Sequence, residues 1–208
     1  DMVFTLAQKY NVDVDMHIDE TDRAECMTLE LLADATVRMG WQGRVTAGHC
    51  CSLAANPPER AGEVLRKVRN AGVRIVSLPS TNLYLQGRGD SYNVRRGIAP
   101  IGRISREFQI PTAVASDNIR DVFNPFGNGN LPEEALIAAH GCHMGGTEGL
   151  GLLFDMISRQ PMEMFGVNPY LREGDEARFI ICDARTAAEV IVGHEKLFGS
   201  FTNNRMEV

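Results

Sequence analysis

The sequence predicts an α/β fold built on a parallel β-sheet, and three observations lead to this prediction. Short apolar runs with the alternation of β-strands are separated by longer amphipathic segments, so strands and helices take turns along the chain. Glycines follow several of the amphipathic segments, as they do at helix ends. The 208 residues are 44% hydrophobic and 23% charged, which is typical of a globular protein with a sizeable core.

Each element up to the fourth predicted strand follows from this pattern. Thr21 or Asp22 is predicted to cap the second helix, and Gly40 to close it. The predicted elements are a helix over 2–10, a strand over 12–18, a helix over 23–39, a strand over 44–49, a helix over 57–72, a strand over 73–78, a polar loop over 79–97, a helix over 98–109 and a strand over 111–117.

The remaining sequence predicts helices and then a small sheet. Helical segments are expected over about 131–143, 147–159 and 160–166. The tail is rich in β-forming residues, and its runs FIIC, EVIV and LFGSFTN are expected to be strands. We therefore divide the chain into residues 1–165, part of a catalytic domain, and residues 166–208, part of a small β-sandwich.

Composition excludes several classes of partner. The formal net charge is −6 and no basic run is present, so we expect no binding to nucleic acid. No apolar stretch approaches the roughly 20 residues of a membrane helix, so we expect no membrane partner. The five cysteines include the adjacent pair Cys50 and Cys51 but no CxxC motif, which favours free thiols in a reducing cytoplasm. This pair is interpreted mainly as small apolar packing at a helix start.

Polar residues at three strand ends decide which parallel-sheet fold is expected. His17, His49 and Asp117 each stand at the carboxyl end of a different predicted strand. Barrel enzymes build their sites from several strand ends that converge on one face, whereas a doubly wound sheet more often has a glycine-rich loop after its first strand. We therefore predict a (β/α)8 barrel of the TIM type, of which this sequence holds the last four strands.

These residue types suit metal-dependent hydrolysis. A neutral imidazole and a carboxylate are both ligands for Zn²⁺ or Fe²⁺, so His17 and Asp117 could share one divalent metal. Such a metal lowers the pKa of a water bound to it and makes the water a nucleophile. Glu20 follows His17 closely and could move protons between water and substrate. His49 could polarise the reacting group, and Asn118 could contact a substrate ring.

Each residue also has a structural interpretation when it is taken alone. A single histidine such as His49 at a strand end is more often a hydrogen-bonded structural residue. Glu20 could be a carboxylate favoured at a helix N-terminus, and Asp117 could cap a turn. His140 and His143 are three residues apart on a predicted helix, but surface packing is the more frequent role of such a pair. The catalytic interpretation depends on three ligand-type residues occurring at successive strand ends.

Four segments of the chain resemble a known family. VDMHIDET, VTAGHC, LPSTNLYLQGR and ASDNIRDVFNPFG are similar, in order and in spacing, to the amidohydrolase superfamily, and in particular to its bacterial cytosine deaminase branch. The resemblance covers nearly all 208 residues. It implies a distorted (β/α)8 barrel with a small β-sandwich, one Zn²⁺ or Fe²⁺ at the barrel mouth and assembly as a homo-oligomer.

The resemblance also implies a role for individual residues. The matching positions are His17 and Asp117 as metal ligands, Glu20 as proton shuttle, His49 as contact to water and substrate, and Asn118 and Phe123 as substrate-binding residues, with Glu20, His49 and Asp117 as the catalytic set.

Two departures from the family pattern bear on function. The family takes two further metal ligands from an HxH motif on its first strand, and no HxH occurs here. A half barrel leaves strand edges unpaired, so we expect the other half as a preceding segment of the same polypeptide. Asn118 stands where cytosine deaminase has a carboxylate, and Phe123 where it has a tryptophan. Because an amide both donates and accepts hydrogen bonds, the substrate ring is expected to differ from cytosine.

The function expected from these features is hydrolytic deamination of a small heterocycle with release of ammonia. Candidate substrates are cytosine-like pyrimidines, isoguanine-like purines, pterins and triazines. A related hydrolase that releases an alkylamine or opens a cyclic amide is the first alternative. A non-catalytic half-barrel fragment is the second, and it would account for the missing HxH motif.

Overall fold

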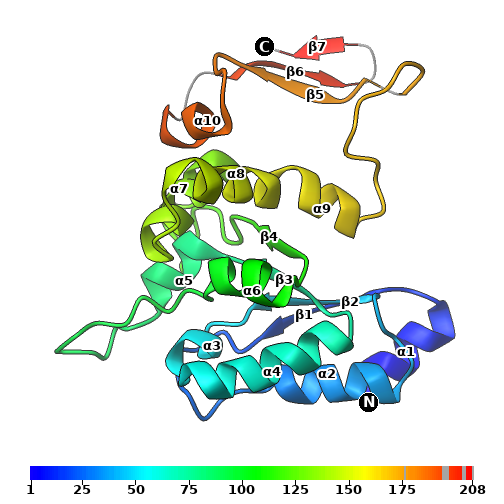
Figure 1. Cartoon of the computed structure of the whole chain (residues 1–208), viewed down its shortest axis with the longest axis vertical. Coiled ribbons are helices and arrows are strands. Elements are labelled where there is room, and N and C mark those ends of the chain that lie inside the picture. The colour runs from blue at the N-terminus through cyan, green and yellow to red at the C-terminus, as the bar shows by residue number, and fades with distance from the viewer. Residues whose placement is uncertain (176, 194–196, 203–204, 208) are drawn as a thin grey trace.

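The core of the structure is a four-stranded parallel sheet (Figure 1). The structure is a computed structural model that describes the chain except residues 176, 194–196, 203–204 and 208. The strand order follows the chain, β1-β2-β3-β4. The strands are β1 (Val14–Ile18), β2 (Val45–His49), β3 (Arg74–Ser77) and β4 (Thr112–Val114). The predicted α/β fold with a parallel sheet is therefore confirmed.

Helices connect the strands and follow the sheet. In chain order they are α1 (Met2–Tyr10), α2 (Leu29–Arg38), α3 (Ser52–Ala55), α4 (Pro58–Asn70), α5 (Pro79–Leu85), α6 (Ile101–Phe108), α7 (Leu131–Gly141), α8 (Gly146–Ile157) and α9 (Arg159–Met164). Helix α4 shows why these segments are helical. Pro58 occupies its first turn, and Ala61, Val64, Leu65 and Val68 are buried at helical spacing.

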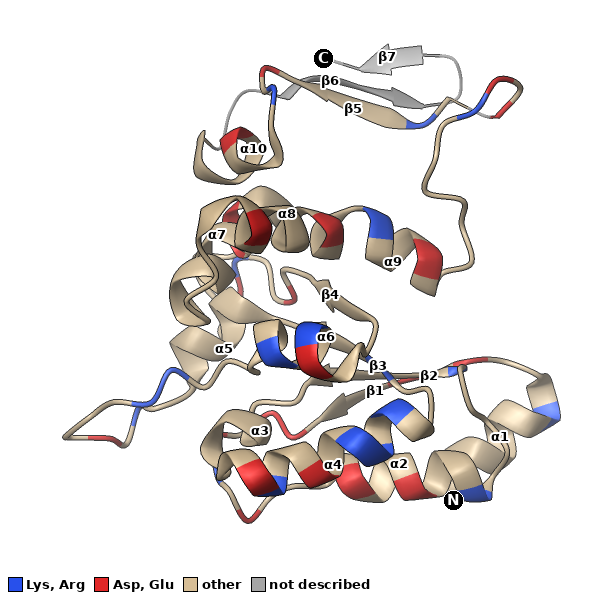
Figure 2. Ribbon diagram, in the orientation of Figure 1, with Lys and Arg blue, Asp and Glu red and all other residues tan. Residues whose placement is uncertain are grey.

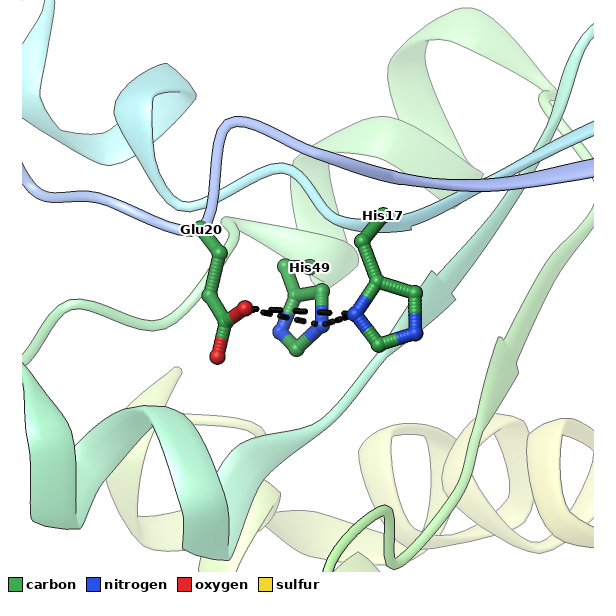
Figure 3. A group of neighbouring side chains, drawn as sticks. All are labelled: His17, Glu20 and His49. Atoms are coloured by element: carbon green, nitrogen blue, oxygen red, sulfur yellow. Dashed lines mark hydrogen bonds and ion pairs between the residues drawn. The ribbon is translucent and has the colours of Figure 1, made fainter. Parts of the chain in front are cut away.

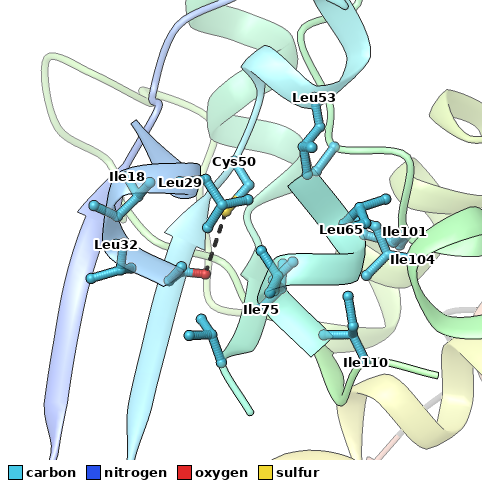
Figure 4. Close-up of a cluster of buried hydrophobic side chains, with 14 of the residues drawn as sticks. Ile18, Leu29, Leu32, Cys50, Leu53, Leu65, Ile75, Ile101, Ile104 and Ile110 are labelled. Carbon is cyan, nitrogen blue, oxygen red and sulfur yellow. Dashed lines mark hydrogen bonds between the residues drawn. The ribbon is translucent and has the colours of Figure 1, made fainter. Parts of the chain in front are cut away.

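A single apolar core joins the sheet to these helices (Figure 4). Ile75 of β3 is fully buried and packs with Leu29 of α2, Leu65 of α4 and Ile104 of α6. Full burial of a side chain of this size contributes about 1.5–3 kcal/mol relative to exposure. The core therefore fixes the relative positions of the strands whose ends carry the predicted site residues.

The opposite face of the sheet borders a cavity. In β1, Val14 and Ile18 are buried while Asp15 and His17 point to the other side and are exposed. The strand register places Thr46 beside Asp15, and Arg74 beside Thr46. These residues line a cavity of about 650 Å³ along the strands. His17 therefore lies on the face of the sheet that borders this cavity.

The C-terminal segment forms a separate small sheet, as predicted. Strands β5 (Phe179–Cys182), β6 (Leu197–Thr202) and β7 (Arg205–Glu207) are antiparallel, in the order β5-β6-β7. One sheet does not make a sandwich, so the β-sandwich stays a prediction. Among the described residues, none of the helices combines the length and the hydropathy that crossing a membrane requires.

Three predicted elements differ from the structure. The run EVIV lies in helix α10 (Ala187–Gly193), where Ile191 is buried against α7 and α8, so the predicted strand is wrong. Short β-branched apolar runs do not separate strand from helix, and here packing decides. The second helix begins at Leu29 with Thr28 as its N-cap residue, so the predicted cap at Thr21 or Asp22 is wrong.

The predicted loop over 79–97 also contains a helix, α5. A carboxylate distant in sequence stabilises its first turn. Glu134 of α7 accepts hydrogen bonds from the Ser80 backbone N–H at 3.0 Å and from the Ser80 hydroxyl. Burial of Glu134 raises the pKa of its carboxyl, and the two Ser80 bonds oppose that shift. Because this cap comes from α7, local sequence does not indicate it.

An ion-pair network between α2 and α4 provides a test of this packing. Glu30 binds Arg60 directly and lies 2.8 Å from Lys67 Nζ (Figure 2 shows both signs of charge along these helices). The Arg60 and Lys67 hydrogen bonds lower the pKa of Glu30 to about 2.

Because this folded-state pKa is lowered, the ion pairs stabilise the fold above the unfolded value of about 4.3 and lose that effect as pH falls. We expect Glu30→Gln to be less stable than wild type in urea unfolding at pH 6. The difference should disappear between about pH 4.3 and pH 2. A difference that persists at pH 2 would contradict this assignment.

Candidate active site

Two neighbouring strand ends bring His17 and His49 together. The parallel register pairs His17 with Gly48 and Ile18 with His49, so the two histidines differ by one position across the strands. His49 has a φ of 69°, and this left-handed turn directs the chain into α3. His17 Nδ1 lies 3.0 Å from His49 Nε2, and the ring centroids are 4.6 Å apart. The sequence prediction that these strand ends converge is confirmed for this pair.

Glu20 completes a three-residue cluster (Figure 3). Its Oε2 lies 3.9 Å from His17 Nδ1 and 3.6 Å from His49 Nε2. One nitrogen from each histidine and one Glu20 oxygen all lie within 4.8 Å of one another. The second helix begins at Leu29 and not near residue 23, so Glu20 is not a helix-terminal carboxylate but part of the loop above the sheet.

The three side chains differ strongly in exposure. His49 is fully buried, whereas the side chain of Glu20 is 37% exposed and that of His17 is 69% exposed. Burial lowers the pKa of His49, while the nearby Glu20 and Asp117 carboxylates oppose that shift. His49 is therefore a neutral imidazole at pH 7, with one N–H and one lone pair.

Asp117 follows β4 at a turn with a φ of 60°. The strand ends at Val114, so the prediction that Asp117 itself ends the strand is wrong. Its charge acts on His49, which places the two groups in the same local electrostatic environment. Oδ2 of Asp117 is buried and has no hydrogen-bond partner among the described residues. A buried carboxylate oxygen without a partner is costly, and a bound cation would supply the partner.

These residues fit a divalent transition metal. Imidazole nitrogens and carboxylate oxygens are the donor types that Zn²⁺ and Fe²⁺ accept. His17 presents Nδ1 to the cluster. Asp117 is not one of the three residues whose ligand atoms lie together, but its unpartnered oxygen is a further donor near His49. The predicted ligands are therefore compatible with a metal centre, although their roles stay predictions.

The two predicted substrate residues lie on the loop after Asp117. The Asn118 amide donates to Asp121 Oδ2 at 2.6 Å, and Asp121 Oδ1 accepts from the backbone N–H of Phe123 at 2.9 Å. The Phe123 residue is 55% exposed. In this chain the Asn118 amide therefore stabilises the loop that presents Phe123, and contact of either residue with a substrate stays a prediction.

Sequence reasoning missed the role of Asp19, which lies between His17 and Glu20. Its backbone has a φ of 53°, and its buried carboxylate accepts from the Leu29 backbone N–H at 3.0 Å and from the Ser52 hydroxyl at 2.9 Å. It also accepts from the backbone N–H and the hydroxyl of Thr28. Asp19 therefore fastens the N-terminus of α2 and the start of α3 beneath the cluster.

A second missed group is Gln86, at the end of α5. Its amide nitrogen donates to the Glu20 carbonyl at 3.2 Å, and its amide oxygen accepts from the Asp22 backbone N–H at 3.2 Å. The neighbouring Gly87 N–H donates to the Asp22 carboxylate at 2.8 Å. This segment holds the Glu20 loop in place. Gln86 and Gly87 belong to the LQGR run, and Asp19 belongs to the HIDET run. These positions therefore lie within the segments that carry the family resemblance.

The other candidate residues do not join the cluster. Burial raises the pKa of the Cys50 thiol, and it raises the pKa of Cys51 to about 12, so neither is a thiolate at neutral pH. Their position before α3 agrees with the packing interpretation. His143 Nε2 instead contacts Arg96 Nη1 at 2.8 Å, at the end of α7.

The Asp19 contacts lead to a stability prediction. We expect Asp19→Ala to lower the free energy of unfolding by about 2–4 kcal/mol, since several buried donors lose their acceptor. The matched control is Asp34→Ala, whose partner Lys67 is 43% exposed, and it should cost less than about 1 kcal/mol. Urea unfolding followed by circular dichroism measures both. Equal, small losses in the two variants would show that Asp19 does not anchor the helices.

Two curated relatives are similar to this chain. A pterin deaminase from Rhizobium rhizogenes (strain K84 / ATCC BAA-868) is 42% identical over 129 residues, which are 62% of this chain and 29% of the relative. An N-isopropylammelide isopropyl amidohydrolase from Pseudomonas sp. (strain ADP) is 28% identical over 210 residues, covering 100% of this chain and 49% of the relative. The chain thus spans about half the length of these relatives or less.

A solved structure matches the fold over almost the whole chain. The 5-methylcytosine deaminase from Klebsiella pneumoniae, liganded with phosphonocytosine, superimposes with a TM-score of 0.92 at 30% sequence identity. The match covers 99% of this chain and 50% of that protein. Residues 1–195 also match the Amidohydrolase family. The predicted relationship is therefore confirmed, and the chain belongs to the Amidohydrolase family.

Proposed function

We propose that the protein is a metal-dependent hydrolase that removes an amino group from a small heterocycle and releases ammonia. The observation that carries the proposal is the cluster of His17, Glu20 and His49, whose ligand atoms lie within 4.8 Å of one another. Such a cluster provides metal ligands, a proton carrier and a hydrogen-bond donor at one place. Membership in the Amidohydrolase family supports the same reaction class.

The metal would be held by His17 and Asp117 of this chain. His17 presents Nδ1 to the cluster, and Asp117 has a buried oxygen without a partner among the described residues. A divalent cation bound there lowers the pKa of water and supplies a hydrolytic nucleophile at neutral pH. Solved structures with this fold hold zinc, which supports zinc here, while the same donor set also suits iron.

Glu20 is the proposed proton carrier. Its carboxylate is within 4 Å of both imidazoles and is partly exposed, so it can reach a substrate above the sheet. It would take one proton from the attacking water and deliver it to the ring nitrogen, and would then carry the proton of the new hydroxyl group to the departing ammonia. Gln86 fixes the backbone of this loop, which limits the positions that the carboxylate can take.

His49 is proposed to contact the reacting carbon's new hydroxyl group. It is buried and neutral, which suits a hydrogen-bond donor that does not itself accept the proton. Asp117 would serve both as metal ligand and as part of the catalytic set.

The proposed substrates are aminated aromatic heterocycles. The relatives include deaminases of a pterin and of 5-methylcytosine, and both names describe flat rings with an exocyclic amino group. Phe123 supplies an exposed aromatic face on the loop beyond Asp117, which could stack on such a ring. Asn118 would contact the ring edge.

A second candidate reaction is release of an alkylamine instead of ammonia. The observation that favours it is the similarity, over the whole chain, to a hydrolase named for removal of an isopropyl amine group from N-isopropylammelide. The same cluster would serve both reactions, since each adds water to a ring carbon that bears nitrogen. Identification of the released product as ammonia or an amine separates them.

The proposed architecture follows from the coverage of the relatives. Residues 1–165 would form half of a (β/α)8 barrel, and residues 166–208 part of a β-sandwich domain. The chain matches about half of the 5-methylcytosine deaminase structure, which supports this arrangement. We further propose a cytoplasmic homo-oligomer.

The role of Glu20 can be tested with an isosteric change. We expect Glu20→Gln to lower kcat by about 10²–10⁴-fold, because the amide cannot carry the proton. Ammonia release is measured on a panel of pterins, pyrimidines and triazines, and the bound metal is measured in the same samples. Glu25→Gln, on the exposed loop that follows, is the matched control and should keep wild-type turnover. Unchanged turnover in Glu20→Gln would exclude its proposed role.

The metal content of the purified protein provides a separate test. We expect about one zinc or iron per chain by elemental analysis, as in a mononuclear catalytic site. Asp117→Asn should lower this content, because it removes a charged ligand, whereas Asp34→Asn at the surface should not. A protein that takes up no metal from a supplemented medium would contradict the proposed centre.

A further inference from the structure

Asn82 lies directly behind His49 and has no role in the reaction described above. It belongs to α5, immediately after β3, and both side chains are fully buried. Asn82 Nδ2 lies 2.9 Å from His49 Nδ1. The imidazole is therefore contacted on one side by Asn82 and on the other by the cluster of His17 and Glu20.

This contact determines which nitrogen of His49 carries the proton. An amide nitrogen only donates, so His49 Nδ1 must present its lone pair to Asn82. A neutral imidazole has a single N–H, which then lies on Nε2. That atom is 3.0 Å from His17 Nδ1 and 3.6 Å from Glu20 Oε2, so the N–H points into the cluster (Figure 3).

We propose that Asn82 is a positioning residue that holds His49 in the Nε2–H tautomer, so that His49 is a hydrogen-bond donor in the cluster and not a metal ligand. The donor role toward a substrate rests on the proposed function, but the tautomer does not. Geometry alone leaves both roles open to His49, because its Nε2 is close enough to the other ligand atoms to bind a metal.

The contact between Asn82 and His49 also determines whether Nδ1 of His17 carries a proton. With Nε2–H on His49, His17 Nδ1 is unprotonated, and its single lone pair accepts this hydrogen bond in the metal-free protein. A metal at this position would bind that lone pair in place of the hydrogen bond. If the Asn82 amide were reversed, His49 would carry Nδ1–H and its Nε2 would accept from a protonated His17 Nδ1. The lone pair of His17 would then lie on Nε2, and Nδ1, the nitrogen that faces the cluster, would have none to offer. The orientation in the structure is the one that makes His17 a ligand and His49 a donor.

The burial of Asn82 makes this control effective. Its Oδ1 is buried and has no hydrogen-bond partner among the described residues. The side chain thus meets His49 with its amide nitrogen, the group for which the structure shows a partner. A buried contact of this kind is stronger than one in water, because the local dielectric constant is low.

The test is the tautomer of His49, measured by solid-state nitrogen NMR on the full-length protein labelled with ¹⁵N-histidine. The sample is freed of metal by chelation and held near pH 8.5, about two units above the usual histidine pKa. The His49 signals are those that His49→Gln removes. We expect an unprotonated Nδ1 and a protonated Nε2. A protonated Nδ1 with an unprotonated Nε2 would overturn the proposal.

The Asn82→Asp variant tests whether Asn82 determines the tautomer of His49. A carboxylate of nearly the same shape only accepts, so the proton should move to His49 Nδ1. Asn93→Asp, on an exposed loop, adds the same charge elsewhere and should leave the tautomer unchanged. A His49 that remains Nε2–H in Asn82→Asp would overturn the positioning role. If this variant does not fold, the wild-type spectrum alone decides the tautomer.

The outcome of the tautomer measurement can be distinguished from the outcome of the test of the proposed function. A protein that shows the Nε2–H tautomer but releases neither ammonia nor an amine retains the role of Asn82 and loses the proposed reaction. An active deaminase whose His49 carries Nδ1–H retains the reaction and loses the role of Asn82.

Discussion

The buried carboxylate of Asp19 is the interaction on which the arrangement of the site depends. It binds the first backbone N–H groups of α2 and the hydroxyl of Ser52 at the start of α3. Its positive φ turns the chain sharply at the end of β1. The residues on either side, His17 and Glu20, are thereby left above the sheet, with both side chains directed at His49. One buried acceptor thus fixes two helices and two site residues together.

The segment after β3 has a comparable influence from the other side. Asn82 contacts the rear of His49, and Gln86, one helical turn later, binds the Glu20 backbone. Glu134 of α7 in turn holds the first turn of this short helix. The proposed hydrogen-bond donor and the proposed proton carrier are therefore both positioned by α5 and the residue that ends it. A change that displaces α5 should disturb His49 and Glu20 at once.

Sequence alone predicted the parts of this arrangement that depend on periodicity. Parallel strands bring their carboxyl ends to one edge, so the meeting of His17 and His49 followed from strand assignment. Prediction from the sequence failed where a residue distant in the chain caps a helix and so determines the local structure. Helix α2 starts at Leu29 because Asp19 caps it across a loop, and α5 exists within a predicted loop because Glu134 caps it from α7. Such contacts leave no local pattern, although the residues that make them lie in or near the recognised motifs.

The exposure of the three cluster residues matches the division of roles between them. His49, the proposed donor, is fully buried and contacts Asn82. The carboxylate of Glu20, the proposed proton carrier, is partly exposed, and Gln86 binds the backbone of its loop. His17 is the most exposed of the three, on the face of the sheet that borders the cavity. In the proposed division of roles, the most buried of the three side chains is thus the hydrogen-bond donor, and the proton carrier is more exposed.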